Sequence, residues 1–224
     1  LCNFDGHNVS ASVTSDMSLT CMAPAHAAGH VNVSIALKGS QWSNVLDFEY
    51  LSLPFVSSIV PAFAPSGGGL DGNVTGEDFE TTTCQLNGAT DLDVTTVSES
   101  RLTFTTPKIA AGAYAVDCSN DGEHFTMTKT PFTVYAPAII TSVAPSVPFP
   151  GSTITVEGED FFNTGMNKCT FNPDSPSTNG SVSTHATFVE AFEITCTVPE
   201  AFEEQNAVWL TVDNGADTTH KWKK

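Results

Sequence analysis

The sequence predicts an all-β protein built of small β-sandwiches in a linear array, and its hydrophobic pattern is the first reason. Apolar and polar residues alternate over short segments such as 113–118 and 208–212, as they do along half-buried strands. Breaks rich in Gly, Pro and Asn, such as 65–69 and 148–151, separate these segments. Short strands with a turn about every ten residues are typical of an immunoglobulin-like sandwich.

Repeated sequence motifs are the second reason to predict an array of sandwiches, and they indicate how many sandwiches the chain contains. Residues 56–61 return as 140–145, residues 76–79 as 158–161, and residues 19–24 as both 102–107 and 194–199. The spacing between Pro61 and Pro145 is too long for a solenoid repeat of about 20–50 residues and suits a small domain. We therefore expect three modules, at 1–53, 54–136 and 137–224. By the same comparison, we expect the first module to lack its first strands and the third to lack its last strand.

The acidic balance of the chain argues against several classes of partner. The chain has 8 basic and 25 acidic residues, for a formal net charge of −17. Nucleic acids and anionic membrane surfaces are bound largely through Lys and Arg, so we expect neither as a partner. No stretch of about 18 consecutive apolar residues occurs, so we do not expect this part of the chain to insert into a membrane.

The cysteines predict both a covalent framework and a compartment. Six cysteines fall two per module, as Cys2 and Cys21, Cys84 and Cys118, and Cys169 and Cys196. Pairing within each repeat predicts one disulfide per module and hence an extracellular or cell-surface location. The alternative is a cytosolic protein with buried free thiols. A zinc site is not expected, because no two cysteines have the spacing of a zinc knuckle.

Four Asn-X-Ser/Thr sequons predict covalent glycans, at Asn8, Asn32, Asn73 and Asn179. Asn32 lies in the alternating segment 31–37, so its side chain is expected to point outward. An outward sequon in a secreted chain is a suitable acceptor for a glycan. We therefore expect occupancy at Asn32 first and at the other three after it.

The order of these motifs resembles the IPT/TIG family, whose immunoglobulin-like modules occur in plexin-type receptors, fibrocystin-like surface proteins and some transcription factors. The motif residues are Cys2, Cys21, Pro24 and the closing 48–50 in the first module, Pro61, Gly76, Phe79, Cys84, Pro107 and the closing 132–135 in the second, and Pro145, Gly158, Phe161, Cys169, Cys196 and Pro199 in the third. The resemblance covers essentially the whole chain and implies tandem immunoglobulin-like (E-set) sandwiches. It says little about function, because this fold hosts many roles.

The second module departs from the family pattern at one cysteine. Phe104 stands where the other modules have Cys21 and Cys196, so Cys84 lacks its usual partner. Cys118 is the other cysteine of this module, and we therefore expect a Cys84–Cys118 disulfide. This departure means that the family's disulfide position does not transfer directly to the second module.

Several polar clusters could suggest catalysis or metal binding, but none has the spacing that such chemistry needs. The glycine run 67–69 has no Lys after it, and His26 and His30 flank a turn. The acidic residues near 91–93 and 120–122 lack the twelve-residue pattern of a calcium loop. The acidic pairs at 77–78 and 159–160 recur at one module position, which favours a shared turn over acid–base chemistry. We expect no enzyme activity, no catalytic residue, no cofactor and no metal site.

An array without catalytic motifs favours a structural or adhesive role. The segments between Tyr50 and Val56 and between Tyr135 and Ile140 are short and contain Pro54 and Pro137, so the joints should be stiff. We expect an extracellular glycoprotein that forms or decorates a surface fibre or coat. The alternative is the ligand-binding ectodomain of a plexin-like or fibrocystin-like receptor. Expected partners are other copies of the chain, joined head to tail through their unfinished sandwiches, or other surface proteins. The alternative to self-association is that the missing strands belong to the same, longer polypeptide.

Overall fold

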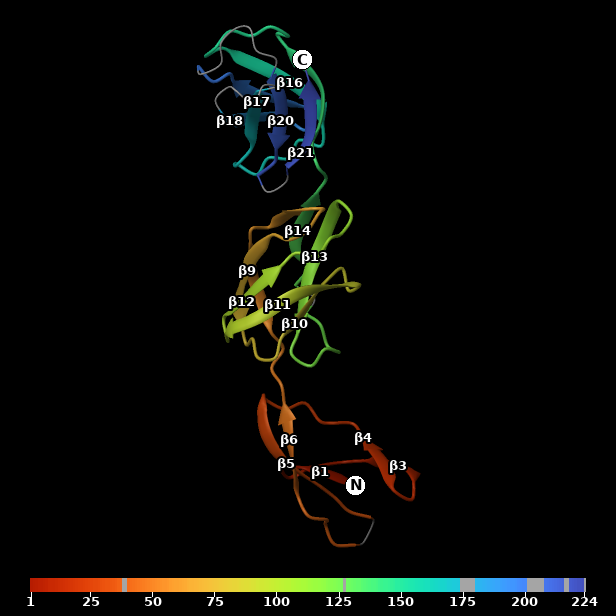
Figure 1. Ribbon diagram of the computed structural model, residues 1–224. Helices are drawn as coiled ribbons and strands as arrows, with labels where there is room; N and C mark the ends of the chain where they lie inside the picture. The colour runs from red at the N-terminus through yellow and green to blue at the C-terminus, as the bar shows by residue number, and fades with distance from the viewer. Residues whose placement is uncertain (38–39, 127, 174–179, 201–207, 216–217, 224) are drawn as a thin grey trace.

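The computed structural model describes residues 1–37, 40–126, 128–173, 180–200, 208–215 and 218–223. The described chain forms strands and turns, with no helix, and follows a path through three modules that succeed one another along one line (Figure 1). The predicted all-β, immunoglobulin-like fold class is confirmed. We use the expected ranges to name the first, second and third modules.

The first module has the smallest core. Its strands are β1 (Cys2–Phe4), β2 (His7–Val9), β3 (Ala11–Ser15), β4 (Ser18–Cys21), β5 (Gly29–Ile35) and β6 (Leu46–Tyr50). Four of them form a sheet in the order β2-β1-β5-β6, and β3 pairs with β4 as a separate hairpin. The buried cluster between these two layers consists of Cys2, Phe4 and Val31.

The second module is a two-layered sandwich with a much larger core. Its strands are β7 (Phe55–Val60), β8 (Phe63–Pro65), β9 (Asp71–Glu77), β10 (Thr83–Leu86), β11 (Thr90–Ser98), β12 (Arg101–Thr105), β13 (Gly112–Ser119) and β14 (Thr130–Tyr135). Their order is β7-β9-β12-β11-β10-β13-β14-β8, and β11 belongs to both layers. Side chains that alternate inward along these strands form one buried cluster, from Val56 to Val134.

The third module repeats this framework. Its strands are β15 (Ile139–Ala144), β16 (Thr153–Glu159), β17 (Lys168–Pro173), β18 (Val182–Glu190), β19 (Glu193–Thr197), β20 (Val208–Asp213) and β21 (Thr218–Lys223), in the order β15-β16-β19-β18-β17-β20-β21. The register equates β16 with β9, β19 with β12 and β20 with β13. Sequence similarity and strand pairing therefore agree on which positions correspond.

Strand β21 is the last strand that the structure describes in the third module. It pairs with β20, and Leu210 stands opposite Trp222 as Val116 stands opposite Thr130 in the second module. The end of β21 therefore corresponds to the beginning of β14. The closing strand of this module begins within the described chain.

The repeated phrase Gly-Glu-Asp-Phe forms the same tight turn in both larger modules. A Cβ on Gly76 would overlap the carbonyl oxygen of Phe55 and the ring of Phe79, and Gly158 stands in the same relation to Ile139 and Phe161. Asp78 and Asp160 each have φ of 58°, a left-handed conformation that Asp tolerates better than most residues. Close backbone packing at this turn therefore explains why the Gly-Glu-Asp-Phe motif recurs in both modules.

Candidate functional site: the joints between modules

Two short joints connect the three modules, and each ends in a buried residue. Residues 51–54 connect β6 to β7, and residues 136–138 connect β14 to β15. Pro54 and Ala138, the last residues of the two joints, are buried. Each joint is thus anchored in the module that follows it, and its remaining freedom depends on the side chains around it.

At the first joint, the buried side chain of Asn120 holds the connecting backbone. Its Nδ2 donates to the carbonyl oxygens of Ser52 (3.0 Å) and Asp78 (2.7 Å). Its Oδ1 accepts from the hydroxyl of Thr82 (2.6 Å) and from the backbone N–H of Glu80 (3.3 Å). Because a buried amide must satisfy its donors and acceptors, Asn120 fixes Ser52 against the turn of the second module.

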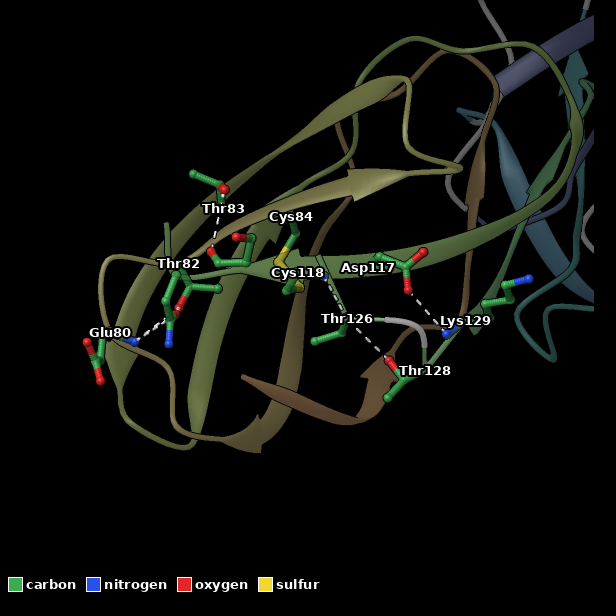
Figure 2. Close-up of a disulfide and its surroundings, with 11 residues drawn as sticks. Glu80, Thr82, Thr83, Cys84, Asp117, Cys118, Thr126, Thr128 and Lys129 are labelled. Atoms are coloured by element: carbon green, nitrogen blue, oxygen red, sulfur yellow. Dashed lines mark hydrogen bonds between the residues drawn. A yellow bond between two sulfur atoms is a disulfide. The ribbon is translucent and has the colours of Figure 1, made fainter. Parts of the chain in front are cut away.

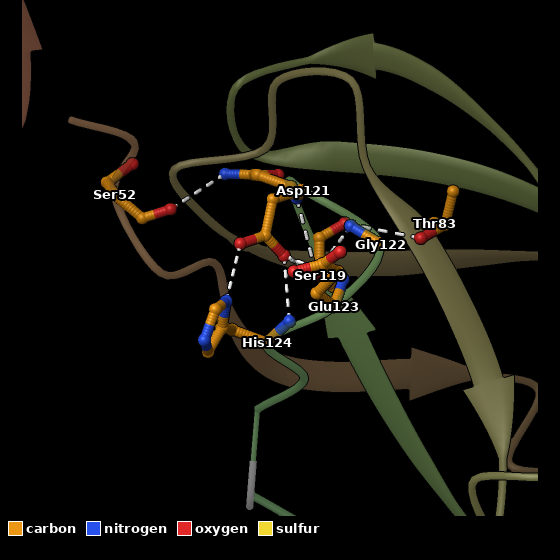
Figure 3. A network of polar contacts seen from close by, with 8 residues as sticks. Ser52, Thr83, Ser119, Asp121, Gly122, Glu123 and His124 are labelled. Atoms are coloured by element: carbon orange, nitrogen blue, oxygen red, sulfur yellow. Dashed lines mark hydrogen bonds and ion pairs between the residues drawn. The ribbon is translucent and has the colours of Figure 1, made fainter. Parts of the chain in front are cut away.

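The loop that follows Asn120 is organised by one carboxylate (Figure 3). Asp121 accepts from the backbone N–H groups of Glu123 (2.8 Å) and His124 (2.7 Å) and from the hydroxyl of Ser119 (2.8 Å). Its second oxygen lies 2.7 Å from Nδ1 of His124. These hydrogen bonds, led by those from His124, hold the pKa of Asp121 well below its usual range, and the carboxylate raises the pKa of His124.

The second joint is closed by aromatic rings. Phe162 of the third module stacks on Tyr135 of the second, with centroids 5.0 Å apart and ring planes 12° apart. It also meets Phe63 at 5.7 Å in an edge-to-face arrangement. Asn214 occupies the position of Asn120 and accepts from the backbone N–H of Phe162 (3.2 Å), which helps to place this ring. By the register of the Gly-Glu-Asp-Phe turn, Glu80 is the residue of the first joint that corresponds to Phe162.

Three disulfides hold the modules, one in each. Cys2 is bonded to Cys21, Cys84 to Cys118, and Cys169 to Cys196. The bond in the second module joins two neighbouring strands (Figure 2). Thr126 holds the backbone of Cys118 by two hydrogen bonds. The backbone N–H of Thr126 donates to the carbonyl of Cys118 (2.8 Å), and its hydroxyl accepts from the Cys118 N–H (3.0 Å).

The sequons occupy different environments. Asn8 and Asn32 are exposed on the outer face of the first module, and Asn32 lies on β5 with its side chain outward. Asn73 is half-buried on β9 and is contacted by Arg101. Asn179 lies outside the described residues.

The remaining polar candidates are scattered. His26 contacts the carbonyl of Ala27 and lies against Tyr50, whereas Nδ1 of His30 lies 2.9 Å from Asp47. Asp47 and Glu49 together raise the pKa of His30. Within the described ranges, no three His, Cys, Asp or Glu side chains gather as metal ligands would. The same ranges contain no helix with the length and hydrophobicity of a membrane span.

The first module leaves apolar surface uncovered. An apolar cavity of about 420 Å³ lies beside the β3–β4 hairpin, lined by Leu1, Ser10, Ala11, Val13, Leu19, Ala36 and Leu37. In the larger modules, β12 and β19 each pair with two strands, but among the described strands β4 pairs only with β3. An unpaired strand edge beside an apolar cavity is suited to strand addition. Sequence reasoning did not anticipate the aromatic joint, because Phe162 and Tyr135 meet only in the folded chain.

Comparison with known proteins places the chain in a fold family. The family model for the IPT/TIG domain matches residues 1–50, 54–134 and 138–221. No curated protein matches the sequence significantly.

Among solved structures, the plexin A4 extracellular region is 16% identical with a TM-score of 0.44, and the match covers 92% of this chain and 18% of that one. A surface glycan-binding protein of Bacteroides ovatus is 17% identical with a TM-score of 0.34, covering 99% of this chain and 59% of that one. One from Prevotella bryantii is 12% identical with a TM-score of 0.31, covering 75% and 41%. The chain therefore spans less than two thirds of each of these proteins.

Proposed function

Because the chain belongs to the IPT/TIG domain family, we propose that it is a structural or adhesive glycoprotein of the cell surface. In this proposal three modules, at 1–53, 54–136 and 137–224, form a rod that builds or decorates a surface fibre or coat. One disulfide in each module supports an extracellular location, since such bonds persist in oxidising compartments. We assign the chain no enzymatic role.

The observation that carries this proposal is the closure of the second joint. Phe162 of one module packs against two rings of its neighbour, and aromatic pairs of this geometry stabilise by about 0.5–1.5 kcal/mol beyond the area that they bury. The joint has three residues and a buried end. A joint this short and this well packed restrains bending, which is the property that a rod requires.

Replacing Phe162 tests the rod. We expect Phe162→Ala to leave both modules folded but to broaden the range of end-to-end distances in small-angle X-ray scattering. Glu80→Ala is the matched control, because it truncates the corresponding residue of the first joint, where no ring is lost. If scattering from the Phe162→Ala chain is indistinguishable from that of the wild type, the ring does not stiffen the joint.

We further propose that copies of the chain associate head to tail, with a strand of one copy completing the open edge of another. The unpaired edge of β4 and the adjoining apolar cavity support this idea, because both would gain by accepting an extended strand. A contact between unlike surfaces of this kind does not close on itself and so produces a filament. The net charge of −17 opposes association, so salt should favour it.

Light scattering and electron microscopy test self-association. We expect the mean mass of the chain to rise with concentration and with added salt, and elongated particles to appear. The variant Val13→Asp, which places a charge in the apolar cavity, should reduce this growth. A chain that stays monomeric at high concentration and in salt would contradict self-association and favour the alternative of a receptor ectodomain with another surface protein as its partner.

A further inference from the structure

The outer face of the second module carries a polar groove with a sequon in its wall. Two rows of side chains cross β9, β12 and β11 in register, namely Asp71, Thr105 and Asp93 in one row and Asn73, Thr103 and Thr95 in the other. These residues line a cavity of about 410 Å³. Pockets of about 300–1,000 Å³ are of the size that holds small ligands.

Arg101 fixes the orientation of the Asn73 side chain. Its Nε and Nη2 lie 3.1 Å and 2.7 Å from Oδ1 of Asn73. Because a guanidinium only donates hydrogen bonds, the atom that it contacts must be the amide oxygen. Nδ2, the atom to which an N-linked glycan is attached, therefore points away from Arg101. On this face, Asn73 is flanked by Thr103 on β12, Val60 on β7 and Asp71 along β9, and Thr103 and Asp71 belong to the groove.

The groove offers groups that match a sugar. Threonine hydroxyls donate and accept hydrogen bonds, and carboxylates accept them, so the two rows complement the hydroxyl and acetamido groups of an N-acetylhexosamine. Val60 stands opposite Asn73 on β7 and is 60% exposed, which provides an apolar surface beside the sequon. A sugar attached at Asn73 would meet polar groups on one side and this apolar side chain on the other.

The corresponding face of the third module keeps only part of this arrangement. Thr155, Thr195 and Thr187 occupy the positions of Asn73, Thr103 and Thr95. Glu193 replaces Arg101. The hydroxyl row is therefore kept, while the attachment point and the guanidinium that orients it occur in the second module.

We propose that this groove is the seat of an N-linked glycan carried by Asn73, whose first sugars lie over Thr103 and Thr95 and are held against the sheet. This inference rests on the proposed function, because it requires that the chain be glycosylated. The exposed Asn32 has no comparable groove among the cavities described, so a glycan there should extend into solvent.

The test compares how fast an amidase removes the glycans from the native chain. The full chain is secreted from eukaryotic cells, and release at Asn73 and Asn32 is followed by mass spectrometry of the peptides. Hydrogen bonds between the sugar and the groove hydroxyls should slow release at Asn73 about tenfold relative to Asn32, which corresponds to about 1.4 kcal/mol. In denatured protein the two rates should be equal.

Two double variants distinguish a glycan that is held by the groove hydroxyls from one that the amidase reaches slowly for steric reasons. Thr95→Val with Thr103→Val removes the groove hydroxyls while keeping β-branched residues, and it should bring the Asn73 rate close to that of Asn32. Thr187→Val with Thr195→Val removes the same hydroxyls from the third module and should change neither rate. The melting temperature of each variant shows whether its modules remain folded.

Each further outcome has a definite meaning. Equal rates in the native wild-type chain, or a slow Asn73 rate that the groove variant does not change, would overturn the inference. An unmodified Asn73 beside a modified Asn32 would also overturn it while leaving the proposed function intact. A chain secreted without any glycan would count against the glycoprotein itself.

Discussion

The second and third modules share a framework but place their disulfides differently. In the third module, Cys169 on β17 reaches Cys196 on β19, so the bond connects the two layers of the sandwich. In the second module, Cys84 on β10 is bonded to Cys118, its direct neighbour on β13, so the bond lies within one layer. The second module therefore holds its layers together without a disulfide between them.

Coordinated changes at corresponding positions account for this difference. Phe104 occupies the position of Cys196, and its ring packs edge-to-face on Phe132 with centroids 6.1 Å apart. Gly72, opposite Phe104, stands where the third module has Ile154, and a Cβ on Gly72 would overlap the Phe104 ring. Aromatic packing replaces the bond between layers, and the missing side chain at residue 72 makes room for it.

Removing the Phe104 ring should have the largest effect on the second module. Phe104 is buried, and truncation of a buried Phe to Ala typically costs about 3–5 kcal/mol because a cavity remains. We expect Phe104→Ala to accelerate hydrogen exchange at the buried amides of Leu102 and Val116, while the third module exchanges as in the wild type. If the second module loses less than about 1 kcal/mol of unfolding free energy, the ring does not connect the layers.

Removing the disulfides should have the next largest effect, and the second and third modules should differ in how much stability they lose. The Cys84–Cys118 and Cys169–Cys196 bonds span 34 and 27 residues, so the chain-entropy estimate for each is about 3–4 kcal/mol. We expect Cys84→Ala with Cys118→Ala to be tolerated better than Cys169→Ala with Cys196→Ala, because Phe104 still packs between the layers of the second module. Thermal unfolding followed by limited proteolysis measures both. If both double variants lose the same stability, the position of the disulfide within the module is unimportant.

Adding a methyl group at Gly72 should destabilise the second module less than either change above. The size of this loss should depend on the side chain at residue 104. Overpacking a core typically costs about 1–3 kcal/mol, so Gly72→Ala should destabilise the second module by this amount. In a Phe104→Leu background the same change should cost less, because the smaller side chain leaves room at residue 72. Denaturant unfolding of the four chains gives the coupling energy. Additive losses would contradict a direct contact between the two side chains.

The sequence predicts those features that depend on local pattern, and it misses those that depend on tertiary contact. Strand alternation and the outward Asn32 follow from the period of the chain. The Asn120–Ser52 contact links residues 68 positions apart, and the Phe162–Tyr135 stack joins two modules, so no local pattern reveals either. Gly72 is an ordinary strand glycine in the sequence, and its relation to Phe104 becomes clear only when the two strands are paired.

The smallest expected effect concerns pH and the loop after β13, where the two modules also differ. Asp121 and His124 form an ion pair in the second module, whereas Gly215 follows the corresponding Asn214 in the third. The pKa of His124 is raised above 6.5, so its contribution to loop order is complete below that value and is lost as pH rises through the raised pKa. The pKa of Asp121 is lowered from 3.8, so its contribution is complete above that value and is lost as pH falls through the lowered pKa.

The loop should therefore be most ordered between about pH 4 and pH 6.5, the interval that the ordinary pKa values of Asp and His bracket. The side chains of His124 and Asp121 are 73% and 37% exposed, so water and salt screen the pair and the effect on global stability is small. An NMR titration of the His124 ring tests the pairing directly. In Asp121→Asn the ring should titrate at a lower pH than in the wild type. An unchanged midpoint would mean that Asp121 does not stabilise the protonated ring.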